Sequence, residues 1–293
     1  MTKTAAIHPG HTDAGVLELK LAHSPDSDDA FMFYALATNK IRSETLRFKH
    51  VLEDIQTLNE KARDMIYDVT AVSFHAYAYL AENYLLLPSG ASFGEGYGPI
   101  VVGHGQLGPE GLRGKRLAIP GKMTSAYMAL MLYERDIETV VVPFDEILDR
   151  VAGGEADAGV VIHEGQLTYS LAGLNKWVDL GEWWQNETGL PLPLGGNVIR
   201  RSLGRSVIRE ATRLLRESIQ YGLDHREEAL LYATQFSRGL DPAAADRFIA
   251  MYVNDWTLNY GERGQRAVQL FFDRGFEAGI LPAHVQAEFA ASF

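Results

Sequence analysis

Apolar and polar residues alternate along residues 16–24, VLELKLAHS, and this period of two predicts a β-strand. The run DDAFMFYALATNKI at 28–41 then changes to helical spacing. The same succession continues along the chain, with strands expected at 46–54, 115–121, 139–144 and 156–164 and helices at 55–65, 124–136 and 145–155. Strands that alternate with helices favour α/β layers with mainly parallel sheets.

Two segments rich in glycine and proline interrupt this succession. GEGYGPI at 94–100 and ETGLPLPLGGNVIRR at 187–201 are both expected to be connections between lobes. The second is expected to be a return loop, or hinge strands that wall the cleft. Beyond the second segment the pattern is helical. We therefore expect two lobes with a ligand cleft between them, lobe one formed by 16–101 plus 199–293 and lobe two by 102–198.

Composition narrows the class of protein. Of the 293 residues, 46% are hydrophobic and 22% are charged, as in globular proteins rather than disordered ones. The net charge of −11 argues against a partner such as nucleic acid or an anionic membrane, because these require a basic surface. The absence of cysteine excludes disulfides, thiolate zinc sites and cysteine nucleophiles.

Two features of the sequence bear on where the protein is located. The polar leader, residues 1–15, contains no apolar run long enough for a signal peptide. No stretch of about 18 apolar residues predicts a membrane span. The expected location is therefore cytoplasmic and the expected partner a small molecule, with a homodimer left open.

The segment SPDSDDA at 24–30 gathers three carboxylates. A calcium loop would need glycine at its sixth position, which counted from Asp26 is a phenylalanine, so this kind of site is excluded. Asp28 and Asp29 are adjacent and point to different sides of a helix, which disfavours a catalytic carboxylate pair. We expect Ser27 to be a helix N-cap with both aspartates in the first turn, where the helix dipole favours negative charge and exposed N–H groups face a ligand.

The turn PGKMTSAY at 120–127 is a second polar cluster at the end of a predicted strand. It is not a phosphate-binding P-loop, because methionine follows Lys122 and the upstream glycine is missing. Thr124 and Ser125 fall at the start of the next helix, where hydroxyl and N–H groups suit a carboxylate or carbonyl ligand. A simple helix cap is the alternative.

The third cluster is VVIHEGQLTY at 160–169. His163 follows a buried apolar run and leaves the predicted strand at its carboxyl end, where α/β proteins bind ligands. The pair His163-Glu164 begins like a zincin motif, but Leu167 stands where the second histidine is required. A ligand-facing histidine and a structural one both fit this position.

Seven motifs, in matching order, resemble the 1,4-dihydroxy-6-naphthoate synthases of the futalosine route to menaquinone: SPDSDDAFMFYAL, VLEDIQTLN, AVSFHAYAYL, GYGPIVV, GKMTSAYMAL, IHEGQLTY and TGLPLPLGGNVIRR. The resemblance runs from Leu17 to beyond Asn259. It implies the two-lobed α/β fold of type 2 periplasmic binding proteins. It also implies a lyase-type enzyme that converts cyclic dehypoxanthinyl futalosine, a small-molecule aromatic carboxylate, to 1,4-dihydroxy-6-naphthoate without a metal or an organic cofactor.

The same resemblance implies a set of site residues. His163 corresponds to the proposed general base, and Glu164 is a weaker candidate as its partner. Thr124 and Ser125 are expected to hold the ligand carboxylate, with Ser73 on the facing wall. The predicted substrate-binding residues are Ser24, Asp26, Asp28, Ser73, Gly98, Thr124, Ser125 and Asn197.

The chain departs from the family pattern in its acidic segment. The family motif reads SPCPNDTF, and here Asp26, Ser27, Asp28 and Ala30 replace its cysteine, second proline, asparagine and threonine. A carboxylate in place of an amide would weaken the binding of an anionic substrate by like-charge repulsion. Two other functions stay open: a non-catalytic binding protein for small carboxylates, and chorismate dehydratase of the same pathway.

Overall fold

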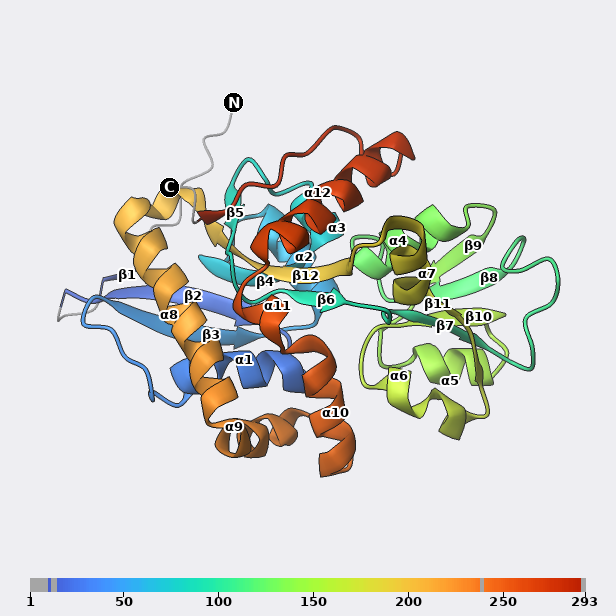
Figure 1. The fold of residues 1–293 in the computed structure, drawn as a ribbon, viewed down its shortest axis with the longest axis horizontal. Coiled ribbons are helices and arrows are strands. Elements are labelled where there is room, and N and C mark those ends of the chain that lie inside the picture. The colour runs from blue at the N-terminus through green and yellow to red at the C-terminus, as the bar shows by residue number, and fades with distance from the viewer. Residues whose placement is uncertain (1–9, 12–14, 238–239, 291–293) are drawn as a thin grey trace.

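The computed structural model describes residues 10–11, 15–237 and 240–290 and contains two β-sheets, one at the centre of each lobe (Figure 1). The first sheet comprises β1 (Gly10–His11), β2 (Leu17–His23), β3 (Leu46–Leu52), β4 (Val69–Ser73), β5 (Tyr84–Leu86), β6 (Ser92–Gly94) and β12 (Leu192–Arg200). The second sheet comprises β7 (Ile100–Gly103), β8 (Arg116–Ile119), β9 (Glu138–Val141), β10 (Ala158–Val161) and β11 (Asn175–Asp179). A two-lobed α/β architecture was the prediction.

Both sheets are mixed, so the prediction of mainly parallel sheets is wrong. β2 pairs in parallel with β3 and β4, and β8 pairs in parallel with β9 and β10. By contrast, β12 is antiparallel to β4, β5 and β6, and β7 is antiparallel to β10 and β11. The chain enters the second sheet at β7 and returns to the first sheet at β12. The alternation of strands and helices in the sequence does not show in which direction these two strands run.

The helices cover the sheets and fill the C-terminal part of the chain, as predicted beyond residue 201 (Figure 1). Their bounds are α1 (Ser27–Ala37), α2 (Ile55–Arg63), α3 (Phe74–Tyr77), α4 (Ser125–Tyr133), α5 (Ile147–Ala152), α6 (Gly165–Thr168), α7 (Leu180–Thr188), α8 (Arg205–Asp224), α9 (Arg226–Ala233), α10 (Pro242–Tyr252), α11 (Asp255–Leu258) and α12 (Gly261–Glu277). Helix α1 packs against α8, α9, α10 and β3, so apolar residues on several of its faces are buried. This packing fixes the start of α1, which carries the acidic segment.

The segment 187–201 is not the loop that its proline and glycine content predicted. It begins with the end of α7 and continues as β12, which lies between β4 and β5 in the first sheet. Gly196 is required inside this strand, because a Cβ there would meet Tyr260 Oη at 2.5 Å and Phe74 Cζ at 3.0 Å. The glycine therefore marks a close approach of aromatic side chains rather than a turn.

The connection between β6 and β7 joins the two sheets, as expected for GEGYGPI. Strand β6 pairs with β12, so the outgoing and returning chains run together between the lobes (Figure 1). The lobe boundary after residue 198 falls inside β12, which belongs wholly to the first sheet. The division into 16–101 plus 199–293 and 102–198 stays a prediction.

Most of the predicted leader, residues 1–9 and 12–14, lies outside the described residues. Gly10–His11 forms β1 and pairs with β2 at the edge of the first sheet. Within residues 10–11, 15–237 and 240–290, no helix has the length and apolar character needed to cross a membrane.

Candidate functional site

A cavity of about 130 Å³ lies between the two lobes. The first lobe lines it with residues that follow β2 and end β4, and the second lobe lines it with residues that follow β8 and β10. Carboxyl ends of parallel strands thus converge from both sheets, as the α/β pattern predicted. The predicted site residues that line the cavity are Ser24, Asp26, Asp28, Ser73, Thr124, Ser125 and His163.

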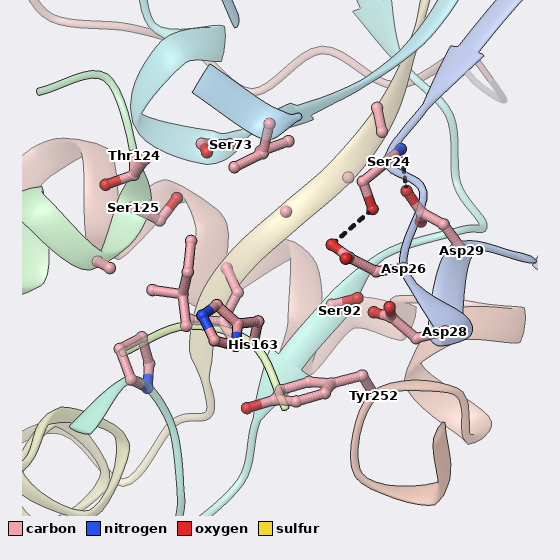
Figure 2. A pocket seen from close by; sticks show the side chains of 18 of the residues that line it. Ser24, Asp26, Asp28, Asp29, Ser73, Ser92, Thr124, Ser125, His163 and Tyr252 are labelled. Carbon is pink, nitrogen blue, oxygen red and sulfur yellow. Dashed lines mark hydrogen bonds between the residues drawn. The ribbon is translucent and has the colours of Figure 1, made fainter. Parts of the chain in front are cut away.

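One side of the cavity, which we call the acidic wall, consists of Ser24, Asp26, Asp28 and Asp29 (Figure 2). The backbone N–H of Ser24 donates to Asp29 Oδ2 at 2.7 Å, and its hydroxyl donates to Asp26 Oδ2 at 2.9 Å. Helix α1 begins at Ser27, with Asp26 as the N-cap residue, so the prediction of Ser27 as N-cap is wrong by one position. Asp28 and Asp29 lie in the first turn, as predicted.

The surroundings of the acidic wall disfavour the charged forms of two of its carboxyl groups. Burial, together with the carboxylates of Asp29, Asp26 and Glu164, raises the pKa of Asp28 well above its ordinary value. Burial also raises the pKa of Asp29 to about 7, against the hydrogen bond from Ser24, which lowers it. The environment therefore favours the neutral form of Asp28, in which a carboxyl O–H can donate a hydrogen bond.

The opposite side, the hydroxyl wall, consists of Ser73, Thr124 and Ser125 (Figure 2). Asn59 Nδ2 donates to Ser73 Oγ at 3.1 Å, and the His75 backbone N–H donates to Ser125 Oγ at 3.3 Å. Each serine oxygen thus accepts a hydrogen bond from the protein, which leaves its own O–H to donate to a ligand.

The Thr124 hydroxyl is engaged in capping a helix, which was the alternative to a ligand contact. Thr124 is the N-cap of α4, where Oγ1 accepts from the Tyr127 N–H at 3.2 Å and donates to the Gly121 carbonyl at 2.8 Å. The cap satisfies one of the N–H groups that a helix leaves without an intrahelical partner. The backbone N–H groups of Ser125 and Ala126 follow in the first turn, where the helix dipole favours an anion.

His163 lines the cavity just beyond the end of β10 (Figure 2). The Gly165 N–H donates to His163 Nδ1 at 2.8 Å, and His163 Nε2 donates to the Phe144 carbonyl at 2.8 Å. Because a backbone N–H can only donate and a carbonyl can only accept, these bonds fix the neutral tautomer with the proton on Nε2. Both ring nitrogens are hydrogen-bonded to backbone in this geometry.

Two predicted residues lie elsewhere. Gly98 is not among the residues that line the cavity; it packs against the backbone of Gly181, where a Cβ would come within 2.9 Å. Asn197 is buried behind the cavity, and its Nδ2 donates to the Gly90 carbonyl at 2.8 Å. Gly90 does line the cavity, so Asn197 supports the lining without reaching a ligand in this arrangement.

Several lining residues were not predicted. The sequence pattern places Asp29 only at the helix start and predicts no site role for Ser92, Gln166 or Tyr252. Ser92 opens a strand of three residues, and Tyr252 ends a helix more than 200 positions after the acidic segment, so neither carries a local signal. Gln166 belongs to the quoted IHEGQLTY motif and was within reach of sequence reasoning.

The cavity has an uneven charge distribution. Among the described residues that line it, none is a lysine or an arginine. An anionic ligand group must therefore rely on neutral donors, and these lie on the hydroxyl wall at the start of α4.

No group of three or more histidine, aspartate or glutamate side chains in the described part of the chain is arranged to hold a metal ion.

Comparison with solved structures establishes the fold. A crystal structure of a protein from Archaeoglobus fulgidus matches 92% of this chain and 100% of its own length, with a TM-score of 0.87 and 45% sequence identity. The alkanesulfonate-binding protein of Xanthomonas axonopodis pv. citri matches with a TM-score of 0.69 at 14% identity, over 92% of this chain and 96% of that one. A Candida albicans protein described as having the generic periplasmic binding protein fold matches with a TM-score of 0.67 at 14% identity, over 91% of both chains. The predicted periplasmic-binding-protein-like fold is confirmed.

Sequence comparison establishes the family. A 1,4-dihydroxy-6-naphthoate synthase of Thermus thermophilus is 42% identical over 262 residues, which cover 89% of this chain and 95% of the relative. A protein of the same name from Streptomyces coelicolor is 36% identical over 271 residues, covering 90% and 95%. Residues 19–277 match the family model described as menaquinone biosynthesis. The chain therefore belongs to the menaquinone biosynthesis family.

Proposed function

We propose that the protein is a lyase-type enzyme that converts cyclic dehypoxanthinyl futalosine to 1,4-dihydroxy-6-naphthoate. The two relatives with 42% and 36% identity carry the name of this product, and both alignments cover 95% of those proteins. The single observation that carries the chemistry is the position of His163, in one interlobe cavity with the hydroxyl wall and the acidic wall.

The ligand carboxylate binds at the hydroxyl wall in this proposal. Ser73 and Ser125 each have an O–H to donate. The first N–H groups of α4 lie at the end of the helix that carries Ser125, and they have no partner within the helix. Hydrogen bonds to a charged group are stronger than those between neutral groups. The oxygen-rich, sugar-derived part of the substrate then faces the acidic wall, where a protonated Asp28 can donate to it.

His163 acts as the general base. Aromatisation requires removal of a proton from the ring system and breakage of the bond to the sugar-derived fragment, and the gain in aromatic stability drives both. Nδ1 is the nitrogen that can take this proton, since Nε2 already carries one. The ring must first release the hydrogen bond from the Gly165 N–H, so proton transfer requires a rotation of the His163 side chain.

The two alternative functions are a non-catalytic carboxylate-binding protein and chorismate dehydratase. A binding protein would need the polar donors of the hydroxyl wall and no general base. The matches with the alkanesulfonate-binding protein and the Candida albicans protein support only the shared fold, at 14% identity. Chorismate dehydratase would use a different substrate in a similar cavity.

Purified protein incubated with cyclic dehypoxanthinyl futalosine, and separately with chorismate, tests the proposal. Mass spectrometry should detect 1,4-dihydroxy-6-naphthoate in the first reaction, at a rate proportional to the protein concentration. Dehydration of chorismate would replace the proposal with the dehydratase function. Tight binding of the naphthoate without turnover of either substrate would establish the non-catalytic alternative.

A further inference from the structure

The segment from His163 to Gln166 is held by the opposite lobe through two hydrogen bonds. Ser27 Oγ, at the start of α1, donates to Glu164 Oε1 at 3.2 Å. Tyr252 Oη, at the end of α10, donates to Gln166 Oε1 at 2.7 Å. Both donors belong to helices of the first lobe, and both acceptors follow β10 of the second sheet. Tyr252 and His163 both line the interlobe cavity (Figure 2).

The two bonds between the lobes lie close in the chain to the contacts that hold the His163 ring. Gln166 Nε2 donates to the Val161 carbonyl at 3.3 Å, so the amide that accepts from Tyr252 is also tied to the end of β10. Gly165, two residues after His163, donates its N–H to Nδ1 of the ring at 2.8 Å. The backbone that holds the ring thus lies between two contacts with the first lobe.

Burial makes the contacts sensitive to cleft opening. Tyr252, Ser27, Glu164 and Gln166 are all at most 8% exposed. Burial raises the pKa of Tyr252, so the hydroxyl stays protonated and can donate. Opening the cleft would separate each donor from its acceptor and expose all four groups to water, whereas in the closed cleft an unpaired buried polar group is costly.

We propose that Tyr252 and Ser27 are positioning residues, whose hydrogen bonds to Gln166 and Glu164 form on cleft closure and hold the His163 segment over the ligand. Nothing in this arrangement requires either residue to touch the reacting atoms. The kinetic part of the proposal rests on the proposed role of His163. The conformational part depends only on the two bonds between the lobes.

A matched pair of substitutions tests the conformational part. Tyr252→Phe combined with Ser27→Ala removes both donors at the lobe contact. The control Tyr84→Phe removes a buried hydroxyl that donates to the Tyr67 carbonyl at 2.7 Å within the first lobe. Small-angle X-ray scattering gives the radius of gyration, with and without saturating 1,4-dihydroxy-6-naphthoate. The double variant Tyr252→Phe/Ser27→Ala should have a larger radius than the wild type in at least one condition, and Tyr84→Phe should match the wild type in both. Radii equal to the wild type in both conditions for the double variant would overturn the proposal.

Kinetics with cyclic dehypoxanthinyl futalosine test the positioning role. Loss of one hydrogen bond should lower kcat of Tyr252→Phe by about 3- to 10-fold, with a smaller change in KM. In a Gln166→Leu background the same substitution should have no further effect, because its partner is already absent. An equal loss in both backgrounds would show that the hydroxyl acts by another route and would contradict the proposal.

Failure of the proposed function is distinguishable from failure of this inference. If the wild-type protein does not turn over the futalosine substrate, the proposed function is wrong, while the scattering comparison still decides whether the two bonds favour the closed cleft.

Discussion

The acidic wall and the hydroxyl wall face the same cavity, yet they differ in charge and in how they are held. The acidic wall runs from the residue after β2 into the first turn of α1. Burial raises the pKa values of Asp28 and Asp29 because it disfavours their charged forms. The hydroxyl wall combines Ser73 at the end of β4 with the first turn of α4, and it carries no ionisable side chain.

Because the walls differ in charge, we expect each to bind a different end of the ligand. An anionic group is repelled by carboxylates and attracted by the start of a helix, so it belongs at the hydroxyl wall. Hydroxyl or carbonyl oxygens can accept from a protonated carboxyl group, so they belong at the acidic wall. The like-charge repulsion expected from Asp28 is reduced because its environment favours the neutral form.

The largest expected effect concerns His163, which lines the same cavity as the two walls (Figure 2). In the variant His163→Asn, kcat should fall by about 10²–10⁴-fold, the usual contribution of a general base. KM should change little, because both walls remain intact. Steady-state kinetics with the futalosine substrate measure both quantities.

A His163→Asn enzyme with kcat close to that of the wild type would remove His163 from the mechanism. The base would then be sought on the acidic wall, where Asp29 has a pKa of about 7.

The hydroxyl wall gives the second effect. Replacing Ser73 and Ser125 together by alanine removes two donors to a charged carboxylate, each worth about 1.5–3 kcal/mol, so affinity for 1,4-dihydroxy-6-naphthoate should fall by about 10²-fold or more. Isothermal titration calorimetry measures this affinity directly. Unchanged affinity in the double variant would place the carboxylate elsewhere.

Thr124→Ala is the control for this experiment. Because its hydroxyl donates to Gly121 and caps α4, its loss should lower the free energy of unfolding by about 1 kcal/mol, while affinity falls less than in the double serine variant. Thr124→Ser should restore the stability, because serine provides the same capping oxygen. A larger loss of affinity from Thr124→Ala than from the serine pair would show that its hydroxyl binds the ligand.

The acidic wall gives the third effect, a dependence of stability on pH. The pKa of Asp29 is 3.8 in the reference state and about 7 when folded, so the folded protein keeps a proton that the unfolded chain releases in this interval. The contribution of Asp29 to the free energy of unfolding is therefore complete below about pH 4. It is lost as the pH rises to about 7, by at most about 1.4 kcal/mol per pH unit. Asp29→Asn removes this contribution.

Urea unfolding of the wild type and of Asp29→Asn at a series of pH values measures the difference. Wild-type stability relative to the variant should decline with rising pH and level off above the folded pKa. A difference that does not vary with pH, or that rises with pH, would show that the folded protein does not retain this proton.

Much of the cavity could be predicted because its residues follow strands. Asp26 and Asp28 follow β2, Thr124 follows β8, and His163 follows β10, and the carboxyl ends of such strands are where ligands bind in α/β folds. The resemblance to a known family added Ser73 as a lining residue and the expectation that His163 is the general base, which stays a prediction.

Other features depend on packing between distant segments. The extent of strand β12 does not follow from its pattern, because Gly196 is needed for contact with Phe74 and Tyr260, and such a contact leaves no periodic signal. Tyr252 reaches the cavity only because α10 packs against α1. The N-cap of α1 is Asp26 rather than Ser27, and sequence patterns do not fix the start of a helix to within one residue.

A crystal structure of the protein with bound 1,4-dihydroxy-6-naphthoate tests the central claim most directly. The account predicts the ligand carboxylate within hydrogen-bonding distance of Ser73 Oγ, Ser125 Oγ and the first N–H groups of α4. The ring hydroxyls should extend toward the acidic wall, and a His163 nitrogen should face the ligand. A carboxylate bound among Asp26, Asp28 and Asp29, or a naphthoate outside the interlobe cavity, would contradict the assignment of the two walls.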